Sequence, residues 1–316
     1  MSEPRRIGKY EIRDLVGKGG ASAVYRGSDG DRIVALKLMN RGTAPEAALA
    51  SLRQGAAALA RVRHPALATF IEVIETDKAL CIVSELAEGE ALSTRLRDAS
   101  PQDLRQTWEI ARQVLEGIES AHAKGVFHGH LNPANLIVDQ QVRVKVTDLG
   151  TGGLAGIVPD AYSAPECLSG AEPNARSDLY QVGAIVYHLV SGRAPFSGSR
   201  EEIAHRARQE RPSDPSSYSP KVAWQLDWVI QRALSKEPMD RFGSAREFLD
   251  GLRLGLQDSI GSPLPVPAPP PAAEARPAPA RVASPVAPPP AAKPQSPKPQ
   301  AAAPASAPPM TASKAA

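Results

Sequence analysis

Two segments of the chain carry groups whose types and spacing could do chemistry. The first, Val16–Tyr25, reads Val-Gly-Lys-Gly-Gly-Ala-Ser-Ala-Val-Tyr, and a glycine-rich hairpin lets backbone N–H groups approach phosphate oxygens without an intervening Cβ. The second, His128–Asn135, reads His-Gly-His-Leu-Asn-Pro-Ala-Asn and contains imidazoles, which can accept a proton near neutral pH. The sequence therefore combines a candidate phosphate-binding turn with a candidate proton acceptor.

Further short motifs accompany these segments in a constant order between residues 8 and 255. They are Val34-Ala35-Leu36-Lys37, Asp148-Leu149-Gly150, Ala164-Pro165-Glu166, Ser177-Asp178-Leu179-Tyr180-Gln181-Val182-Gly183 and Asp240-Arg241-Phe242. A glycine-rich turn alone is a weak signal, whereas an ordered set of motifs is specific. Together they resemble the bacterial Hanks-type serine/threonine protein kinase family, with His128–Asn135 in the place of its catalytic loop.

The resemblance implies an α+β, bilobal protein-kinase-like fold. A β-rich N-lobe is expected over residues 8–86 and a mostly α-helical C-lobe over 87–257, the two forming one kinase domain. Residues 258–316 are expected to be a disordered Pro/Ala-rich tail, because residues 259–316 hold 18 of the chain's 31 prolines and no aromatic residue. Such a composition buries too little apolar surface to offset the entropy of ordering.

The resemblance also implies that ATP and Mg²⁺ are bound at particular positions. Phosphate groups would contact Gly17, Gly19 and Lys37, and Asn135 and Asp148 would hold the metal ion. The groups implied around the adenine ring are the backbone of Glu85 and Ala87 and the side chains of Val24, Ala35 and Ile137. The structural residues implied are the ion pair Glu166 and Arg241, and Asp178 as anchor of the apolar column Leu59, Phe70, His128 and Leu149.

Several positions depart from the family pattern where the family performs its chemistry. His130 stands in the place of the base Asp, and Asn132 in the place of the loop Lys. Gly55 occupies the position of the glutamate that, in the family, pairs with the lysine corresponding to Lys37. Pro159 stands in the place of the threonine before Ala-Pro-Glu, and Gly129 stands in the place of an arginine. Loss of one such electrostatic group typically costs about 10²–10³ in rate. The pattern is typical of a kinase degenerate at the catalytic loop, a pseudokinase.

His130 itself has two interpretations, and neither makes a confident catalytic assignment. It can be a structural histidine packed under the loop, without a chemical role. It can also be a substitute base, because a neutral imidazole accepts a proton, although an imidazolium has lost that acceptor.

Local patterns predict the strands and the helix that would position the glycine-rich segment and Lys37. Residues 10–39 alternate in the manner of strands joined by short turns, and Ala79–Val83 forms a further strand. A helix should begin at Thr43-Ala44-Pro45-Glu46, a capping-box pattern, and run to Arg61.

A second helix should precede the candidate catalytic loop. Ser100-Pro101-Gln102-Asp103 provides its cap, and Gly125 closes it after Lys124. Its apolar residues follow the helical period, so one face should pack in the core.

Charge and cysteine content bound the possible partners. Residues 1–258 hold 32 basic and 33 acidic residues, so this part has no basic signature for nucleic acid. Cys81 and Cys167 indicate neither a disulfide framework nor a metal site. The chain has no run of about 18 apolar residues and no signal-peptide core, so we expect no membrane span and a cytoplasmic location.

Three functions stay open on this basis. The first is a pseudokinase that binds ATP and Mg²⁺ and acts in signalling through unknown protein partners. The second is an active serine/threonine kinase with an unconventional catalytic loop, and the third is a scaffold that binds no nucleotide and uses its proline-rich tail. Lys37, Asn135 and Asp148 favour the first over the third, and His130 and Asn132 favour it over the second.

Overall fold

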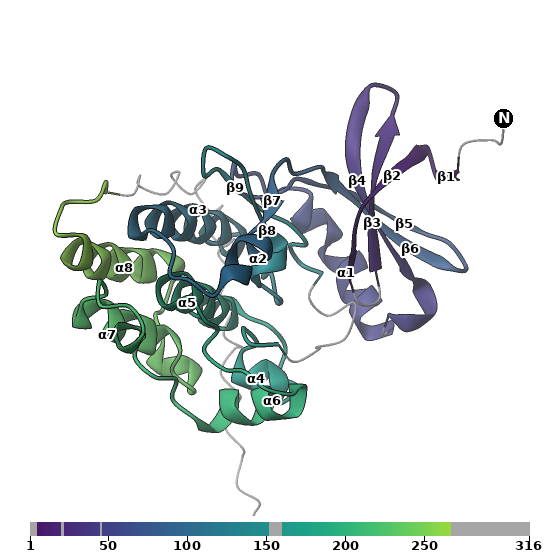
Figure 1. Cartoon of the computed structure of the whole chain (residues 1–316). Coiled ribbons are helices and arrows are strands. Elements are labelled where there is room, and N and C mark those ends of the chain that lie inside the picture. Colours follow the sequence, from purple (N-terminus) through teal and green to yellow (C-terminus); the bar gives the residue numbers. More distant parts are fainter. Residues whose placement is uncertain (1–4, 20–21, 45, 152–159, 267–316) are drawn as a thin grey trace, which may run out of the picture. The chain divides into compact units, whose positions relative to one another are not determined.

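The computed structural model describes residues 5–19, 22–44, 46–151 and 160–266, and in them six strands form one antiparallel sheet (Figure 1). The order is β1-β2-β3-β4-β6-β5, with β1 (Arg6–Ile7), β2 (Tyr10–Gly19), β3 (Ser22–Asp29), β4 (Arg32–Asn40), β5 (Phe70–Glu75) and β6 (Ala79–Glu85). The strands predicted over residues 10–39 and 79–83 are confirmed.

The two faces of this sheet differ: one packs on an apolar cluster, and the other carries Lys37. Val34 and Leu36 of β4 are fully buried in an apolar cluster on one face, together with residues of β1, β2 and β6. Successive strand side chains point to opposite faces, so Ala35 and Lys37 lie on the other face. The alternation of β4 therefore places Lys37 on the side from which it reaches the second lobe.

Helix α1 (Glu46–Leu59) follows β4 and buries Leu49, Leu52 and Leu59. It ends two residues before the predicted Arg61, because Ala60 and Arg61 continue only as a turn. The carboxylate of Glu46 accepts hydrogen bonds from the side chains of Arg41 and Arg53, whereas the predicted capping partner Thr43 has a side chain outside the described residues.

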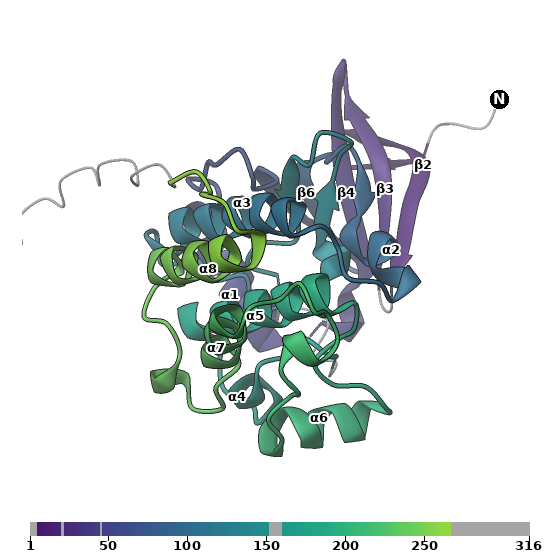
Figure 2. The ribbon, with the colours of Figure 1, turned by 60° about the vertical axis from the view of Figure 1, so that its left-hand side comes forward.

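Helices dominate the second lobe, where they surround a buried central helix (Figures 1 and 2). The elements are α2 (Leu92–Arg95), α3 (Leu104–His122), α4 (Pro165–Leu168), α5 (Ala175–Ser191), α6 (Arg200–Gln209), α7 (Trp224–Ala233) and α8 (Ala245–Ile260), with a small sheet of β7 (Glu90–Ala91), β8 (Leu136–Val138) and β9 (Val144–Val146). Nearly all residues of α5 are buried, as expected of a helix packed on all sides.

The N-cap of helix α3 is the last residue of the predicted capping segment Ser100–Asp103. Asp103 is its N-cap, and the Asp103 carboxylate accepts hydrogen bonds from the backbone N–H groups of Arg105 and Gln106. The helix ends at His122, two residues before the predicted Lys124. Gly125 has a positive φ of 70°, and its N–H donates to the carbonyl of His122, so it closes the turn after the helix.

The ordered part of the chain extends further than the composition suggests. Helix α8 continues to Ile260, Leu264 is buried in the core, and Arg105 donates a hydrogen bond of 2.6 Å to Ser262. Residues 258–266 therefore belong to the fold, which corrects the predicted start of a disordered tail at 258. Ile260 and Leu264 pack in the core cluster, and the hydroxyl of Ser259 accepts a 2.9 Å hydrogen bond from the N–H of Ala223, so contacts distant in sequence hold this segment. The rest of the tail lies outside the described residues.

The arrangement is an α+β bilobal fold with a β-rich N-lobe and a mostly α-helical C-lobe, as predicted. The division between the lobes at residues 86 and 87 stays a prediction. Over the described ranges, every helix is too short or too polar to cross a bilayer.

Candidate functional site

A lysine from one lobe meets an aspartate from the other. Nζ of Lys37 on β4 lies 2.7 Å from Oδ2 of Asp148, which follows β9 after one residue. The two side chains are about one fifth exposed, at 19% and 23%. Asp148 has a φ of 63°, a conformation uncommon for residues other than glycine, and this turn directs its carboxylate toward the N-lobe.

The glycine-rich hairpin lies on β2 and β3. Gly17 pairs with Val24 and Gly19 with Ser22, and the tip at residues 20–21 is outside the described residues. A Cβ at Gly17 or Gly19 would meet no atom of the described residues within 4 Å. Packing within the protein therefore does not require these glycines, and the space beside them is available to a ligand.

The segment after β6 has the polar groups predicted to meet a purine ring. Ala35 pairs with Ser84 across β4 and β6, and the N–H of Glu85 donates to the carbonyl of Thr69. The N–H of Ala87, by contrast, makes no hydrogen bond to any described residue, so it remains available as a donor. Ala35 is buried, while the side chains of Val24 and, on β8, Ile137 are half-buried.

Asn135 and Asp148 provide oxygen ligands of the kind that Mg²⁺ prefers. The backbone carbonyl of Asn135 accepts a 2.9 Å hydrogen bond from the N–H of Thr147, the neighbour of Asp148. The Asn135 amide donates to the carbonyl of His130 at 3.0 Å, so its oxygen is directed elsewhere. Mg²⁺ usually takes one or two protein oxygens together with substrate phosphates. The two side chains fit that role, although the described residues hold no cluster of three or more His, Cys, Asp or Glu that could bind a metal alone.

His130 has an acidic neighbour that the sequence did not indicate. Its Nε2 lies 3.6 Å from Oδ2 of Asp160, which comes from the segment before α4. The other oxygen of Asp160 accepts hydrogen bonds from the N–H of Tyr162 and the hydroxyl of Ser163, both at 2.9 Å. The carboxylate is thus held in place, with Nε2 of the imidazole near its other oxygen.

Asn132 is engaged in the local structure of the same loop. Its side-chain oxygen accepts a 2.9 Å hydrogen bond from the N–H of Ala134 and caps the 3₁₀ turn Pro133–Asn135. An amide used in this way carries no charge. The geometry of the loop is therefore maintained without a cation.

Two polar residues of α5 hold the backbone of this loop. Asp178 is completely buried, and its oxygens accept hydrogen bonds from the N–H groups of His128 and Gly129 and from Nε2 of His122, each at 2.8 Å. One turn further along α5, Gln181 accepts from the N–H of Leu131 at 2.7 Å. Gly129 has a φ of 80°, a conformation that favours glycine.

The comparison with known proteins agrees with the geometry described above. Residues 10–251 match the family model for the protein kinase domain. The chain belongs to the protein kinase family.

Several curated bacterial kinases are similar to this kinase domain. A probable serine/threonine-protein kinase of Streptomyces coelicolor is 31% identical over 290 residues, which cover 83% of this chain and 43% of that protein. The serine/threonine-protein kinase PksC of the same organism is 32% identical over 271 residues, covering 77% and 48%. PknL of Mycobacterium tuberculosis is 32% identical over 253 residues, covering 75% and 63%. The chain spans less than half the length of the first of these relatives.

The interior column of the kinase domain is continuous in the structure. Leu59, Phe70 and Leu149 belong to one buried apolar cluster, and a Cβ on Gly150 would lie 2.8 Å from Leu59, which shows how closely α1 approaches this segment. His128 is fully buried and its Nε2 contacts the carbonyl of Thr147 at 2.8 Å. Burial lowers the pKa of His128, so its ring packs in the column as a neutral group.

Glu166 and Arg241 form a bidentate ion pair at the base of the kinase C-lobe, with both N–O distances at 2.7 Å. Arg241 is 1% exposed, and its remaining N–H groups donate to the carbonyls of Arg176, Ser235 and Lys236. All donors of the guanidinium are therefore satisfied, which is the condition for a tolerable buried charge.

Of the two remaining positions that depart from the kinase pattern, the structure describes one. Gly55 lies within α1, and a Cβ there would meet no atom within 4 Å. Pro159 lies outside the described residues.

Sequence reasoning missed Asp160 and the loop anchor Gln181. The i, i+3 spacing of Asp178 and Gln181 in an otherwise apolar helix was a usable signal for the anchor. No local signal pointed to Asp160.

Proposed function

We propose that this kinase domain binds ATP and Mg²⁺ between its lobes but transfers phosphate poorly, and that it acts as a pseudokinase in signalling through contacts with protein partners. The observation that carries the proposal is the state of the catalytic loop. The base position holds His130, whose Nε2 is turned to Asp160, and Asn132 caps its own loop. Neither residue offers the charge that the family uses at these positions.

The arrangement of the residues predicted to bind nucleotide supports the binding half of the proposal. Lys37 and Asp148 already lie together across the lobes, the N–H of Ala87 is available, and the glycine positions leave room for phosphate. When bound, Mg²⁺ would neutralise charge on the phosphates, and Asn135 and Asp148 would hold it. Lys37 would place a point charge on the phosphate oxygens.

The decisive experiment measures binding and transfer on the same purified full-length chain. Thermal unfolding is followed with ATP, with and without Mg²⁺, beside transfer of labelled phosphate to a general protein substrate, with an active serine/threonine kinase as positive control. Stabilisation by ATP without transfer above background supports the proposal. No stabilisation at any ATP concentration would favour a scaffold that binds no nucleotide, and would sink the binding half.

An active kinase with an unconventional loop is the second candidate, because the Asp160 carboxylate beside His130 could orient the imidazole for a substrate hydroxyl. Transfer that is fast in the natural chain, lost in both His130→Ala and Lys37→Met, and reduced in Asp160→Asn would establish this candidate in place of the pseudokinase.

A further inference from the structure

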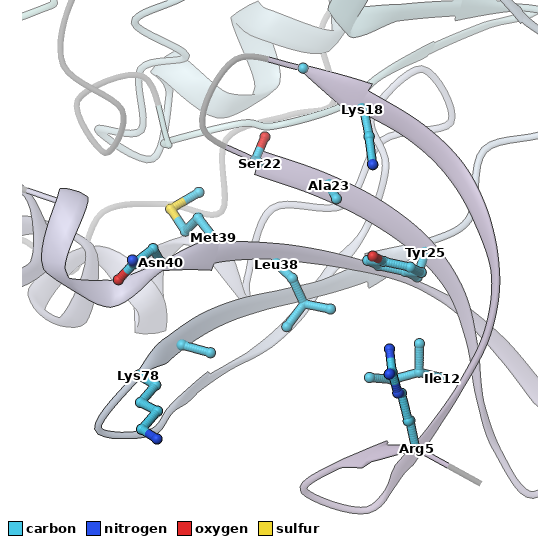
Figure 3. Close-up of a pocket in the computed structure, with 12 residues that line it drawn as sticks. Arg5, Ile12, Lys18, Ser22, Ala23, Tyr25, Leu38, Met39, Asn40 and Lys78 are labelled. Carbon is cyan, nitrogen blue, oxygen red and sulfur yellow. The ribbon is translucent and has the colours of Figure 1, made fainter.

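A groove of about 750 Å³ lies on the N-lobe sheet, and residues of β2, β3 and β4 provide most of its lining (Figure 3). Ala23 and Tyr25 line it on either side of Val24, and Leu38 lines it next to Lys37. Neighbouring side chains on a strand point to opposite faces. Since Val24 and Lys37 belong to the proposed nucleotide site, Ala23, Tyr25 and Leu38 face away from it, on what we call the outer face of β3 and β4. The groove meets the proposed phosphate-binding turn only at its edge, where Gly19 also lines it.

Three cations surround this outer groove, and none of them has a side-chain partner among the residues that the structure describes. Arg5, Lys18 and Lys78 are exposed lining residues, and within the described part of the chain their side chains make no hydrogen bond or ion pair. Nearby cations behave differently: Lys9 pairs with Asp29 and Glu72, and Arg41 with Glu46 and Glu75. No described lining residue is acidic. The groove therefore concentrates positive charge that the described residues leave uncompensated.

The floor of the outer groove is apolar. Ile12, Tyr25 and Leu38 are half-buried and lie between the cations, which Figure 3 shows at three sides of the floor. These three side chains also pack on the buried cluster of the sheet, so the floor is rigid rather than a collection of loose surface groups. A ligand that covers it would have to offer apolar groups as well as negative charge.

We propose that the outer groove binds an extended acidic segment of a partner protein in which acidic and apolar side chains alternate. An extended segment turns alternate side chains to opposite directions, so apolar groups can meet the floor while acidic groups reach Arg5, Lys18 and Lys78. Three cations around an apolar floor suit such a peptide better than a nucleic acid, whose binding depends on many phosphate contacts. Residues 259–316 of the chain carry five basic residues and one acidic residue, so they do not supply this charge.

The test uses the full-length chain without nucleotide, so its result is independent of the proposed ATP binding. The probe is a fluorescein-labelled pool of ten-residue peptides with Asp or Glu at odd positions and Leu, Ile, Val or Tyr at even positions. Fluorescence anisotropy at about 50 mM and 200 mM salt gives the affinity for the peptides, and the difference between the two salt concentrations shows how much of that affinity depends on charge. We expect saturable binding that weakens at the higher salt concentration.

Variants assign the binding to the groove. The triple variant Arg5→Ala, Lys18→Ala, Lys78→Ala should lower the affinity at least tenfold, and Tyr25→Ser should lower it at both salt concentrations. A matched triple variant removes three exposed cations outside the groove, Arg32→Ala, Arg97→Ala and Lys221→Ala, and should bind as the natural chain does. Thermal unfolding verifies that each variant is folded, and single variants replace any triple variant that is not.

The outcomes separate the possible ligands. Equal binding by both triple variants, or no binding of the pool, would overturn the proposal. Tighter binding of a labelled single-stranded oligonucleotide or of a poly-glutamate peptide would also overturn it, because the apolar floor would then contribute nothing. Hydrogen exchange that slows specifically in Ser22–Asp29 and around Lys78 on adding the peptide pool would place it in the groove.

Discussion

Lys37 and Asp148 form an ion pair between the two lobes, with 2.7 Å between Nζ and Oδ2. The same two side chains are the ones proposed to hold phosphate and metal. Since α1 has Gly55 at the position where the resemblance implies a glutamate, the aspartate is the carboxylate that the lysine finds in this structure. When nucleotide binds, its phosphates and metal ion would therefore have to separate Lys37 from Asp148 or bind to both side chains at once. Because the two residues come from different lobes, nucleotide binding would affect how closely the lobes approach each other.

Replacing Lys37 tests whether this lysine grips the nucleotide. Lys37→Met should weaken ATP·Mg²⁺ binding at least tenfold in calorimetry, because a point charge on the phosphates is lost. Stability without nucleotide should change by less than about 1 kcal/mol, since both members of the ion pair are partly exposed to solvent. Lys221→Met, on an exposed residue of the C-lobe, is the matched control. Unchanged affinity in Lys37→Met would argue against the site.

Restoring the family residues tests the cause of the proposed impairment. The variant His130→Asp, Asn132→Lys, Asp160→Asn should raise phosphate transfer at least tenfold, because it supplies the carboxylate and the cation and removes a second carboxylate beside them. Transfer is measured with labelled ATP on a general protein substrate. Adding Lys37→Met to the triple variant should abolish the gain. A triple variant no faster than the natural chain would show that the loop residues are not what limits transfer.

Removing one partner of the buried ion pair Glu166–Arg241 should destabilise the domain strongly. Glu166→Gln leaves a guanidinium that is 1% exposed without its counter-charge, and we expect a loss of about 3–5 kcal/mol in urea unfolding at pH 7. Glu210→Gln, in the exposed pair with Arg206, should stay within about 0.5 kcal/mol. Similar effects of the two changes would contradict the assigned burial.

Two helical glycines should respond oppositely to alanine. Gly55→Ala should stabilise the domain by about 0.5–1 kcal/mol, because the added Cβ meets open space within α1. Gly183→Ala should destabilise it by about 1–3 kcal/mol, because the Cβ would lie 2.7 Å from the Cβ of Ala233 where α5 packs on α7. Urea unfolding of both variants provides the comparison. Equal signs would show that α5 and α7 do not pack as closely as described.

His188 should make the domain sensitive to mild acid. Burial lowers its pKa from 6.5 to about 4, and its Nδ1 contacts the hydroxyl of Tyr162 at 2.7 Å. Between these two pH values the unfolded chain binds a proton that the folded chain does not, so stability is full above pH 6.5 and falls toward pH 4. The loss should be on the order of 2 kcal/mol, allowing for the partial exposure of the ring.

Unfolding of the natural chain and of His188→Gln, measured from pH 7 to pH 4, checks this expectation. The variant should lose a clear part of the pH dependence, whereas His205→Gln, on an exposed histidine of α6, should keep it. Identical profiles for all three proteins would refute the assignment.

Much of the molecule follows from local pattern. Strand alternation and the apolar period of α3 predicted these elements, and the predicted capping segment Ser100–Asp103 contains the observed N-cap Asp103. The motifs also made Lys37, Asn135 and Asp148 candidates for the site, because glycines, a strand lysine and an Asp-Leu-Gly turn can be recognised without knowing what they touch. Composition was less reliable where a helix end depends on distant contacts, as at residues 258–266.

The sequence by itself determined the family, the order of elements and the residue types at the catalytic loop, since these depend on neighbours along the chain. Only the tertiary structure decided that Lys37 pairs with Asp148, 111 positions away, that Asp160 stands beside His130, and that Gln181 holds Leu131. These contacts join segments whose separation carries no periodic signal, and their partners are chosen by how the buried helices and the sheet pack together.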